Sequence, residues 1–162
     1  MSISSKMMAG ALGLTMFAGA AIGASHSAPN DEQIKAAIKG RQAIMQLYAY
    51  NIGTLAAMAK GERDYDAEAA QAAADNMAAV NGLKMGGVWL PGSSIESGME
   101  TRALPAIWES GSDIGEKAAA LSEAISGLQA AAGTDLASLR GAIGPVGKAC
   151  GSCHEDFRQS DD

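Results

Sequence analysis

Apolar positions recur along most of the chain with the spacing of buried helix faces, and the longest such segment covers residues 31–60. Steps of four and three residues alternate along it, which is the spacing of a heptad seam. The inward positions are Ile34, Ile38, Arg41, Met45, Tyr48, Ile52, Leu55 and Ala59. Asn30 suits an N-cap and Gly61 suits a helix end. The pattern therefore predicts one long helix over residues 31–60.

A second helix is predicted over residues 67–83, with Asp66 as its N-cap. Its inward face is rich in alanine, which permits close approach of a neighbouring helix. Residues 84–101 then contain Gly-Gly, Pro-Gly and Ser-Ser pairs, which interrupt regular structure. An irregular segment of this length in a compact domain is usually functional or disordered. Trp89 and Leu90 give it an apolar anchor, so we expect it to pack on the helices.

A third helix is predicted to start near Arg102 or Leu104, with Pro105 in its first turn, where proline is tolerated. Gly133 is its expected end. Apolar positions recur at helical spacing through this stretch. We therefore expect one further amphipathic helix between these residues.

The fourth predicted helix runs from Asp135 to about Arg158, with Thr134 as its cap. Its seam again alternates three and four and reads Leu136, Leu139, Ile143, Val146, Cys150, Cys153 and Phe157. Both cysteines of the chain therefore lie on a buried helix face. The result is an all-α domain, which agrees with abundant alanine, few β-branched residues and only 4% aromatic residues.

Residues 1–27 look like a secretory signal peptide, which leaves a mature domain over residues 28–162. Lys6 supplies a positive charge before an apolar run, and small residues follow that run. Cleavage after Ala24 and cleavage after Ser27 both stay open. The run is too short to favour a membrane span, and no other apolar run approaches the required length. We therefore expect export, in a bacterium to the periplasm, with no membrane insertion of the mature chain.

The chain is acidic, with a formal net charge of −6 that becomes −7 when Lys6 leaves with the signal peptide. Nucleic acid attracts basic patches, so this charge argues against a nucleic-acid partner. A basic redox partner is compatible with it, although acidity alone mostly favours solubility.

The sequence Cys150-Gly151-Ser152-Cys153-His154 is a C-x-x-C-H motif, the arrangement that attaches c-type haem. Two thiols at this spacing can each form a thioether with one vinyl group of the same haem. The histidine that follows is then an axial ligand of the iron. We therefore predict one covalently attached haem c, with Cys150 and Cys153 as the attachment points and His154 as the iron ligand.

Other uses of these residues fit less well. A redox dithiol normally follows a strand in a βαβ unit, and no strand pattern precedes this motif. A zinc site needs four ligands, and the only other histidine, His26, lies in the predicted signal peptide. A structural disulfide would not call for His154. A c-type haem is attached outside the cytoplasm, so the predicted export agrees with the haem.

Arg41 is the one charged residue on the inward seam of the first helix. A guanidinium on an apolar stripe is costly unless it is paired. Arg41 either extends to the rim of the bundle, which needs no partner, or pairs with a haem propionate, which suits its bidentate geometry. With haem in the bundle we favour the propionate. Met45, one turn later, is either a core filler or a thioether that faces the iron.

Trp89 and Arg158 are further candidates for the haem pocket. Trp89 either packs over a haem edge or closes the end of the core, and the sequence favours neither. Arg158, four residues after His154, either lies near the haem edge and the iron ligand or complements the dipole at the helix end.

The mature chain resembles bacterial cytochrome c′ over nearly its whole length. The stretches that carry the resemblance are RQAIM at 41–45, LAAMAKG at 55–61, AIW at 106–108 and VGKACGSCHEDFR at 146–158. All c-type cytochromes share the C-x-x-C-H motif. Its position near the C-terminus and the segment around Arg41 are what point to this family.

The resemblance implies an antiparallel up-down-up-down four-helix bundle with covalently bound haem, often as a homodimer. It implies thioethers at Cys150 and Cys153 and a proximal ligand at His154. It maps the family's propionate-binding residue onto Arg41, and Gln42 in the same stretch is assigned to the haem pocket as well.

The resemblance also implies the chemistry. Typical members have no protein ligand on the distal iron face, which an apolar side chain covers at the position of Met45, and their iron is five-coordinate and high-spin. Such proteins bind nitric oxide and carbon monoxide, and electron transfer with redox partner proteins is also proposed for them. Low-spin relatives use a methionine at the Met45 position as sixth ligand. We favour the five-coordinate form and keep the six-coordinate form as the alternative.

An enzyme such as a peroxidase is the competing class. Peroxidase chemistry needs a distal acid–base group, usually a histidine with an arginine. The mature chain contains no histidine besides His154. We therefore predict a binding or electron-carrying protein and not an enzyme.

Overall fold

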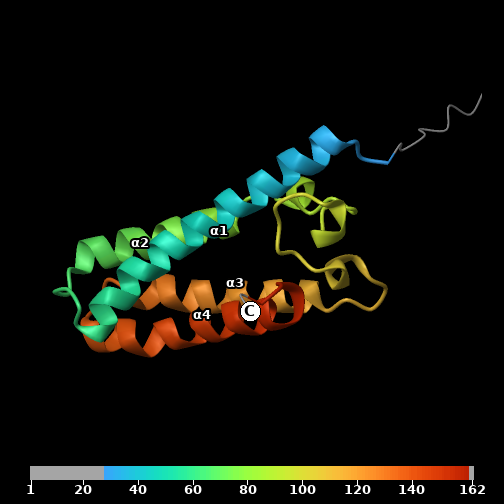
Figure 1. Ribbon diagram of the computed structural model, residues 1–162. Coiled ribbons are helices and arrows are strands. Elements are labelled where there is room, and N and C mark those ends of the chain that lie inside the picture. The colour runs from blue at the N-terminus through green and yellow to red at the C-terminus, as the bar shows by residue number, and fades with distance from the viewer. Residues whose placement is uncertain (1–27, 161–162) are drawn as a thin grey trace, which may run out of the picture.

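The computed structural model describes residues 28–160, which form four long helices joined by turns and one irregular segment (Figure 1). The helices are α1 (Asp31–Lys60), α2 (Ala67–Asn81), α3 (Ile114–Ala131) and α4 (Leu136–Phe157). Three 3₁₀ turns lie between α2 and α3, namely η1 (Gly86–Val88), η2 (Ile95–Ser97) and η3 (Pro105–Trp108). Each helix packs against the next, and α4 packs back against α1. The predicted antiparallel up-down-up-down four-helix bundle is confirmed.

The boundaries of α1 follow from its two caps and agree with the predicted residues 31–60. The Asn30 side chain accepts a hydrogen bond from the Gln33 backbone N–H at 3.0 Å, and the Gln33 side chain accepts one from the Asn30 backbone N–H at 2.9 Å. This capping box satisfies N–H groups that a first helical turn leaves unpaired. At the other end Gly61 has φ 78°, a left-handed conformation that glycine adopts without strain.

The third helix begins later than the sequence predicted. Residues near Arg102 and Leu104 do not start it, because the chain there makes only the short turn η3 and α3 starts at Ile114. The backbone is extended at Leu104 and again at Glu109, and Gly111 has φ 89°. These conformations interrupt helical hydrogen bonding, so the predicted start is wrong.

Two smaller boundaries also differ from the prediction. Helix α2 ends at Asn81, followed by Gly82 as its C-cap, and not at residue 83. The cap of α4 is Asp135 and not Thr134, because the Asp135 carboxylate accepts a hydrogen bond from the Ser138 backbone N–H at 2.7 Å. A carboxylate also interacts favourably with the positive end of the helix dipole.

The apolar core fills one end of the bundle, where α1 ends and α4 begins. Its largest fully buried side chains are Leu55, Met58, Met77, Ile125, Leu128, Leu139 and Val146. Helix α2 contributes mainly Ala70, Ala73 and Ala74, whose small side chains let α1 and α3 approach it. Full burial of one large aliphatic side chain stabilises the fold by roughly 1.5–3 kcal/mol. This packed end therefore supports the other end of the bundle, where the helices leave room for a site.

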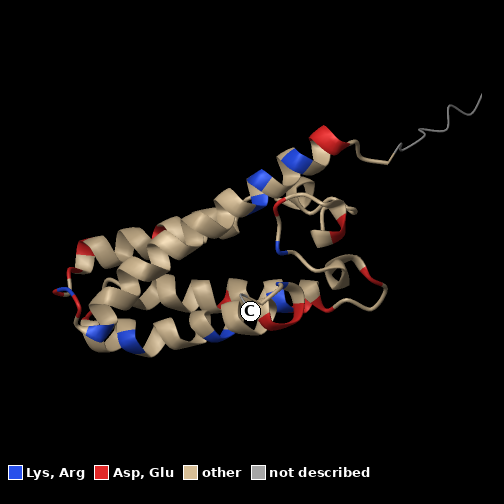
Figure 2. Cartoon of the chain, in the orientation of Figure 1, with Lys and Arg blue, Asp and Glu red and all other residues tan. Residues whose placement is uncertain are grey.

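At that other end, the irregular segment over residues 82–113 lies beside the first half of α1 (Figure 1). Figure 2 shows charged residues toward the helix ends and on the connections, and α1 contains none between Arg41 and Lys60. Within residues 28–160, no helix combines the length and the apolar character that crossing a membrane requires.

Candidate functional site

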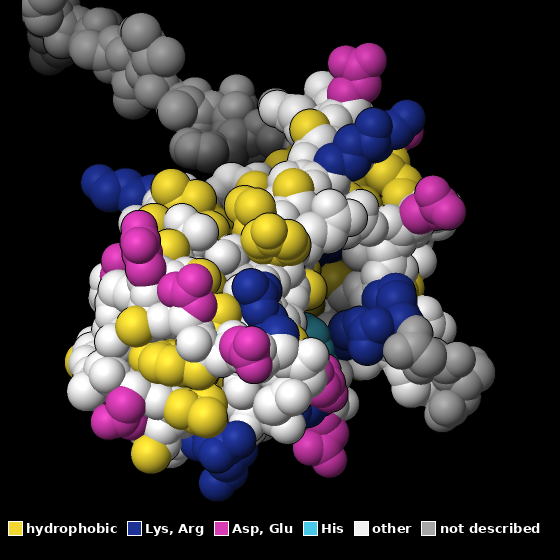
Figure 3. Space-filling view, turned by 90° about the vertical axis from the view of Figure 1, so that its left-hand side faces the viewer, with side chains coloured by type: hydrophobic (Ala, Val, Ile, Leu, Met, Phe, Trp, Pro, Cys, Tyr) yellow, Lys and Arg dark blue, Asp and Glu magenta, His cyan; other side chains and the backbone are white. Residues whose placement is uncertain are grey.

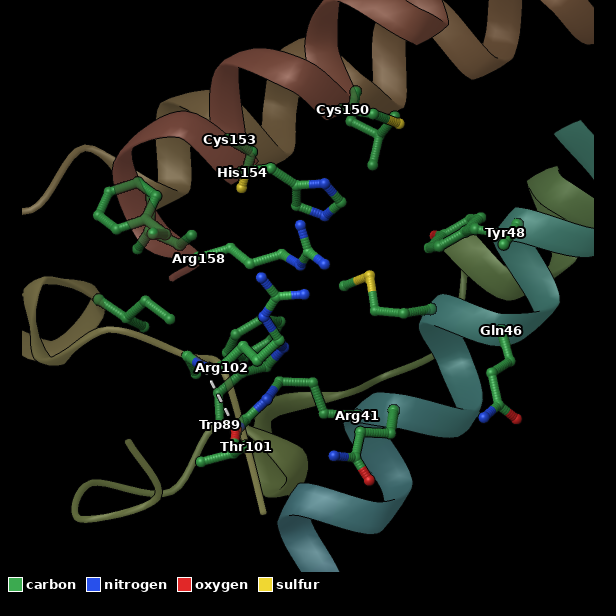
Figure 4. A pocket seen from close by; sticks show the side chains of 18 of the residues that line it. Arg41, Gln46, Tyr48, Trp89, Thr101, Arg102, Cys150, Cys153, His154 and Arg158 are labelled. Atoms are coloured by element: carbon green, nitrogen blue, oxygen red, sulfur yellow. Dashed lines mark hydrogen bonds between the residues drawn. The ribbon is translucent and has the colours of Figure 1, made fainter. Parts of the chain in front are cut away.

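A cavity of about 910 Å³ opens between α1, the irregular segment and the second half of α4. The candidate residues that line it are Arg41, Gln42, Met45, Trp89, Cys150, Cys153, His154 and Arg158. The close view shows His154 pointing from α4 into the cavity, with Tyr48 of α1 on the far side (Figure 4). Figure 3 shows a hollow on the molecular surface with a histidine inside it and basic side chains beside it. Segments that are far apart in sequence therefore bring all eight candidates to one site.

Helix α4 presents the two cysteines to this cavity through its own periodicity. Cys150 and Cys153 are three residues apart, so both side chains lie on the same helix face. The thiols are not joined in a disulfide. Burial raises the pKa of both thiols, and the nearby Lys117 ammonium opposes this shift at Cys153. The site therefore holds two neutral thiols on one wall, which suits attachment of a single group at two points.

His154 directly follows Cys153 on α4, and its imidazole enters the same cavity (Figure 4). Desolvation lowers the pKa of the imidazole, and the cation of Arg158 lowers it further. A lowered pKa keeps the ring neutral near pH 7, and the neutral ring is the form that binds a metal.

Lys117 on α3 holds α4 at the motif. Its ammonium donates to the Ser152 carbonyl oxygen at 3.2 Å and to the Ser152 hydroxyl at 3.0 Å. It also forms ion pairs with Asp156 and with Asp113, the latter at 3.8 Å. Only 17% of the Lys117 side chain is exposed. These contacts fix the segment between the two cysteines against a neighbouring helix.

Arg41 is buried, with 5% of its surface exposed, and the irregular segment binds its guanidinium. Nη1 donates to the Val88 carbonyl and to the Ser93 hydroxyl, both at 3.0 Å. Nη2 donates to the Ser93 carbonyl at 2.8 Å and to the Thr101 hydroxyl at 3.1 Å. The interpretation that Arg41 extends to the rim of the bundle is therefore wrong.

Two tryptophans flank the same guanidinium. Its central carbon lies 5.0 Å from the ring centroid of Trp89 and 5.8 Å from that of Trp108, within the range of cation–π attraction. The Trp108 indole N–H donates to the Trp89 carbonyl at 3.0 Å. Burial lowers the pKa of Arg41, and its hydrogen bonds offset the cost of burying the charge. Trp89 therefore both lines the cavity and supports Arg41.

Gln42 and Met45 occupy the α1 wall of the cavity. Gln42 donates from Nε2 to the Glu100 carbonyl at 2.9 Å, which ties α1 to the irregular segment a second time. Met45 is 37% exposed, so it is not a filler of the packed core. Whether the Met45 thioether covers the iron or ligates it stays a prediction.

The irregular segment also joins the end of α4. Ala103 and Arg158 form an antiparallel bridge, and the Gln159 backbone N–H donates to the Arg102 carbonyl at 2.8 Å. The two walls of the cavity, α1 and α4, are thus connected through one segment that binds both.

Arg102 is a cavity residue that the sequence analysis did not identify. The sequence placed it at the start of a helix, and no motif marks it as a pocket residue. In the structure its side chain enters the cavity together with that of Arg158 (Figure 4). Only the path of the irregular segment brings the two arginines to the same place.

The residues of this cavity fit a haem. Its volume of about 910 Å³ lies within the range of cofactor pockets. Two thiols and a neutral imidazole meet on one wall, and three arginines line the cavity for a group that carries carboxylates. Among residues 28–160, no cluster of three or more histidine, cysteine, aspartate or glutamate side chains is placed to hold a bare metal ion.

Comparison with known proteins agrees with this chemistry. The family model described as Cytochrome C' matches residues 36–158. A cytochrome c-554 from Cereibacter sphaeroides is 46% identical over 134 residues, which is 83% of this chain and 88% of that protein. A cytochrome c′ from the same species is 37% identical over 139 residues, which is 86% of this chain and 91% of that protein.

Solved structures with the same description share the fold. A cytochrome c′ from Rhodobacter spheriodes matches with a TM-score of 0.76 at 37% identity, over 78% of this chain and 98% of that one. The nitric oxide complex of a mutant cytochrome c prime from Alcaligenes xylosoxidans matches with a TM-score of 0.68 at 30% identity, over 78% and 97% of the two chains. A cytochrome c′ described by its ligand-controlled dimer dissociation matches with a TM-score of 0.71 at 31% identity, with the same coverage.

Proposed function

Since the chain belongs to the cytochrome c′ family, whose members carry covalent haem c, we propose that it is a periplasmic protein that binds nitric oxide and carbon monoxide at a five-coordinate, high-spin haem iron. Electron transfer with a redox partner protein is part of the same proposal. The proposal rests on the observation that Cys150, Cys153 and His154 line the same cavity of about 910 Å³. The nitric oxide complex of a structural neighbour supports the choice of ligand.

Cys150 and Cys153 would hold the haem through two thioethers, and His154 would ligate its iron. When bound, the haem supplies an iron that takes up diatomic gases and accepts or gives one electron. Lys117 keeps this part of α4 in place through Ser152. The chain's own contribution is therefore attachment, orientation and a protected cavity.

The α1 wall of the cavity supports binding and not catalysis. Its apolar members are Met45, Ala49 and Ile52, and its polar members are Arg41, Gln42, Gln46 and Tyr48. Gln46 and the Tyr48 phenol do not exchange protons readily near pH 7, and desolvation raises the pKa of Tyr48 further. Peroxidase-type chemistry needs a distal acid–base group, and within residues 28–160 His154 is the only histidine. We therefore propose a protein without enzymatic activity.

A six-coordinate electron-transfer cytochrome, with Met45 as sixth ligand, is the second candidate. Met45 lines the same cavity as His154 and is 37% exposed, which is the observation in its favour. Relatives named cytochrome c-554 and cytochrome c′ both match the chain. We prefer the five-coordinate form because the sequence stretches of the resemblance are those of its typical members.

We propose location and assembly on separate grounds. Residues 1–27 lie outside the described residues and carry the signal-peptide pattern, which supports export and a mature domain over residues 28–162. On α1, Leu47 is 48% exposed and Tyr50 is 74% exposed, so an apolar surface is available to a second copy of the chain. A structural neighbour described by its dimer dissociation supports a homodimer.

One set of measurements on the exported protein tests the proposal. Mass spectrometry should show one covalently added haem, and replacement of Cys150 and Cys153 by alanine should abolish the addition. Absorption spectra should show high-spin iron in both oxidation states and should change when carbon monoxide or nitric oxide is added. A wild-type chain without covalent haem would refute the proposal. A low-spin spectrum would favour the second candidate.

A further inference from the structure

The α1 wall of the cavity contains one phenol whose hydroxyl the protein leaves without a partner. Tyr48 is buried, with 8% of its surface exposed, and it lines the cavity. Among residues 28–160, none forms a hydrogen bond with its hydroxyl. In this part of the chain, the Ser112 hydroxyl is the only fully enclosed side-chain oxygen or nitrogen that lacks a partner. The Tyr48 hydroxyl is therefore unpaired and open to the cavity.

The other polar side chains of this wall are engaged elsewhere. The terminal nitrogens of Arg41 donate four hydrogen bonds to the irregular segment. Gln42 donates from Nε2 to a carbonyl of the same segment at 2.9 Å. Gln46 is exposed, and Figure 4 shows its amide directed away from His154. Tyr48 is thus the hydrogen-bond donor of the α1 wall that remains for a molecule inside the cavity.

Tyr48 also lies on the side of the cavity where a ligand of the iron would bind. The His154 imidazole enters from α4, and Tyr48 lies opposite it (Figure 4). The two axial positions of a haem iron lie on opposite faces of the ring, so an iron held by His154 turns its other position toward α1. Met45 and Tyr48 are three residues apart on α1, so both side chains border that position.

The chemistry of a phenol suits a donor at this place. Desolvation raises the pKa of Tyr48 above its usual 10.0, and Cys150 raises it further, so the hydroxyl keeps its proton near pH 7. When a haem fills the cavity, water leaves this hydroxyl, and a buried donor without a partner costs free energy. Bound carbon monoxide or nitric oxide carries partial negative charge on its outer atom and accepts a hydrogen bond. Donors in the ligand pocket influence which gases a haem iron holds.

We propose that the Tyr48 hydroxyl donates a hydrogen bond to the diatomic gas on the haem iron and so determines how strongly this protein holds it. The inference rests on the haem and the gas binding proposed above. Met45 supplies an apolar contact to the bound gas, and Tyr48 supplies a directed polar one. The pocket therefore favours a ligand whose outer atom accepts a hydrogen bond.

The test compares the carbon monoxide complexes of the haem-loaded, reduced wild type and Y48F by infrared spectroscopy. Phenylalanine keeps the ring and removes only the hydroxyl. A donor that faces the outer oxygen draws electron density from the iron into the ligand and weakens the C–O bond, so the C–O stretching frequency should be higher in Y48F. Carbon monoxide should also dissociate about two- to tenfold faster, as expected for the loss of one hydrogen bond between neutral groups.

Y50F is the matched control, because it removes the same atom from the same helix at a side chain that is 74% exposed. Its C–O frequency should equal that of the wild type. The inference is overturned if Y48F also keeps the wild-type frequency, or if both variants shift equally. Wild-type protein that lacks covalent haem or takes up no carbon monoxide refutes the proposed function together with this inference. Loaded protein that binds the gas with one frequency in wild type and Y48F refutes only the role of Tyr48.

A second measurement identifies the donated proton. In heavy water the phenol proton is replaced by deuterium, so the C–O frequency of the wild type should shift, whereas that of Y48F should not. A shift that Y48F retains would assign the donor to another group and overturn the inference. If Y48F does not accumulate, Y48M takes its place under the same criteria, since methionine adapts to irregular space.

Discussion

The ammonium of Lys117 donates to the carbonyl oxygen of Ser152 at 3.2 Å, so α3 is bonded to the backbone between the two cysteines of the C-x-x-C-H motif. The motif therefore depends on a residue that lies 33 positions before Cys150 in the sequence. Four predictions follow from this and from other contacts of the fold.

Replacement of Lys117 by methionine should lower the thermal stability of the loaded protein, because Ser152, Asp156 and Asp113 lose their partner. The hydrogen bond with Asp156 is the main cause that raises the pKa of Lys117 above its usual 10.5. The stabilising contribution is therefore complete below pH 10.5 and is lost as the pH rises through the higher folded-state value. K148M, which removes the same charge at an exposed position of α4, is the control. Equal melting temperatures for the two variants would contradict this role of Lys117.

Two glycines of α1 and its cap should respond in opposite directions to alanine. Gly53 lies on the exposed face of α1, whereas Gly61 follows the helix and has φ 78°. A Cβ atom added at either position would meet no atom within 4 Å. G53A should stabilise the protein by about 0.5–1 kcal/mol through helix propensity. G61A should destabilise it by about 1 kcal/mol because alanine is strained in the left-handed conformation. Urea unfolding measures both, and a stabilised G61A would be inconsistent with the observed cap.

The Asp135 cap should give α4 a pH-dependent stability. Hydrogen bonds from Ser138 hold the pKa of Asp135 below its usual 3.8. A lowered carboxyl pKa contributes stability that is complete above pH 3.8 and is lost as the pH falls through the folded-state value. D135A should therefore be less stable than wild type at neutral pH, and the difference should shrink in acid. D135N keeps an acceptor for Ser138 and should lose less stability. Thermal melts between pH 3 and pH 7 test the pattern, and a constant difference would speak against it.

Met45→Leu distinguishes the two candidate functions. Leucine keeps the apolar character of the α1 wall and removes the sulfur. If Met45 only covers the site, the ferric and ferrous spectra should stay high-spin, and carbon monoxide should bind with an affinity within about a factor of ten of wild type, as expected for a volume-conserving swap that costs less than about 1.5 kcal/mol. A change from low-spin to high-spin iron in this variant would instead establish Met45 as a ligand.

The sequence predicted the long helices because local signals and the apolar seam agree there. Asn30 and Gly61 mark the ends of α1, because asparagine is a common N-cap and glycine adopts the left-handed conformation that ends a helix. The start of α3 was not predictable in the same way. Residues 105–108 have helical spacing, but Gly111 adopts φ 89° after them, and spacing alone does not show which glycine does so.

The site was predictable where it depends on a motif and not where it depends on the irregular segment. Cys150, Cys153 and His154 are adjacent in sequence, so their common position on α4 follows from helix geometry. The partners of Arg41 are 47 to 60 residues away along the chain. No periodicity links Arg41 to Thr101, and none places Arg102 in the cavity.

The bridge between Ala103 and Arg158 also has a consequence for the order of maturation. Helix α4 follows the other three helices along the chain, so the irregular segment can bind α1 before α4 is made but can join the end of α4 only when residues 157–159 exist. Chemistry at the cysteine thiols needs access from outside, whereas the bridge draws the irregular segment across the end of α4. We therefore expect attachment of the cofactor to precede this contact, and the bridge to be among the last contacts that the chain forms.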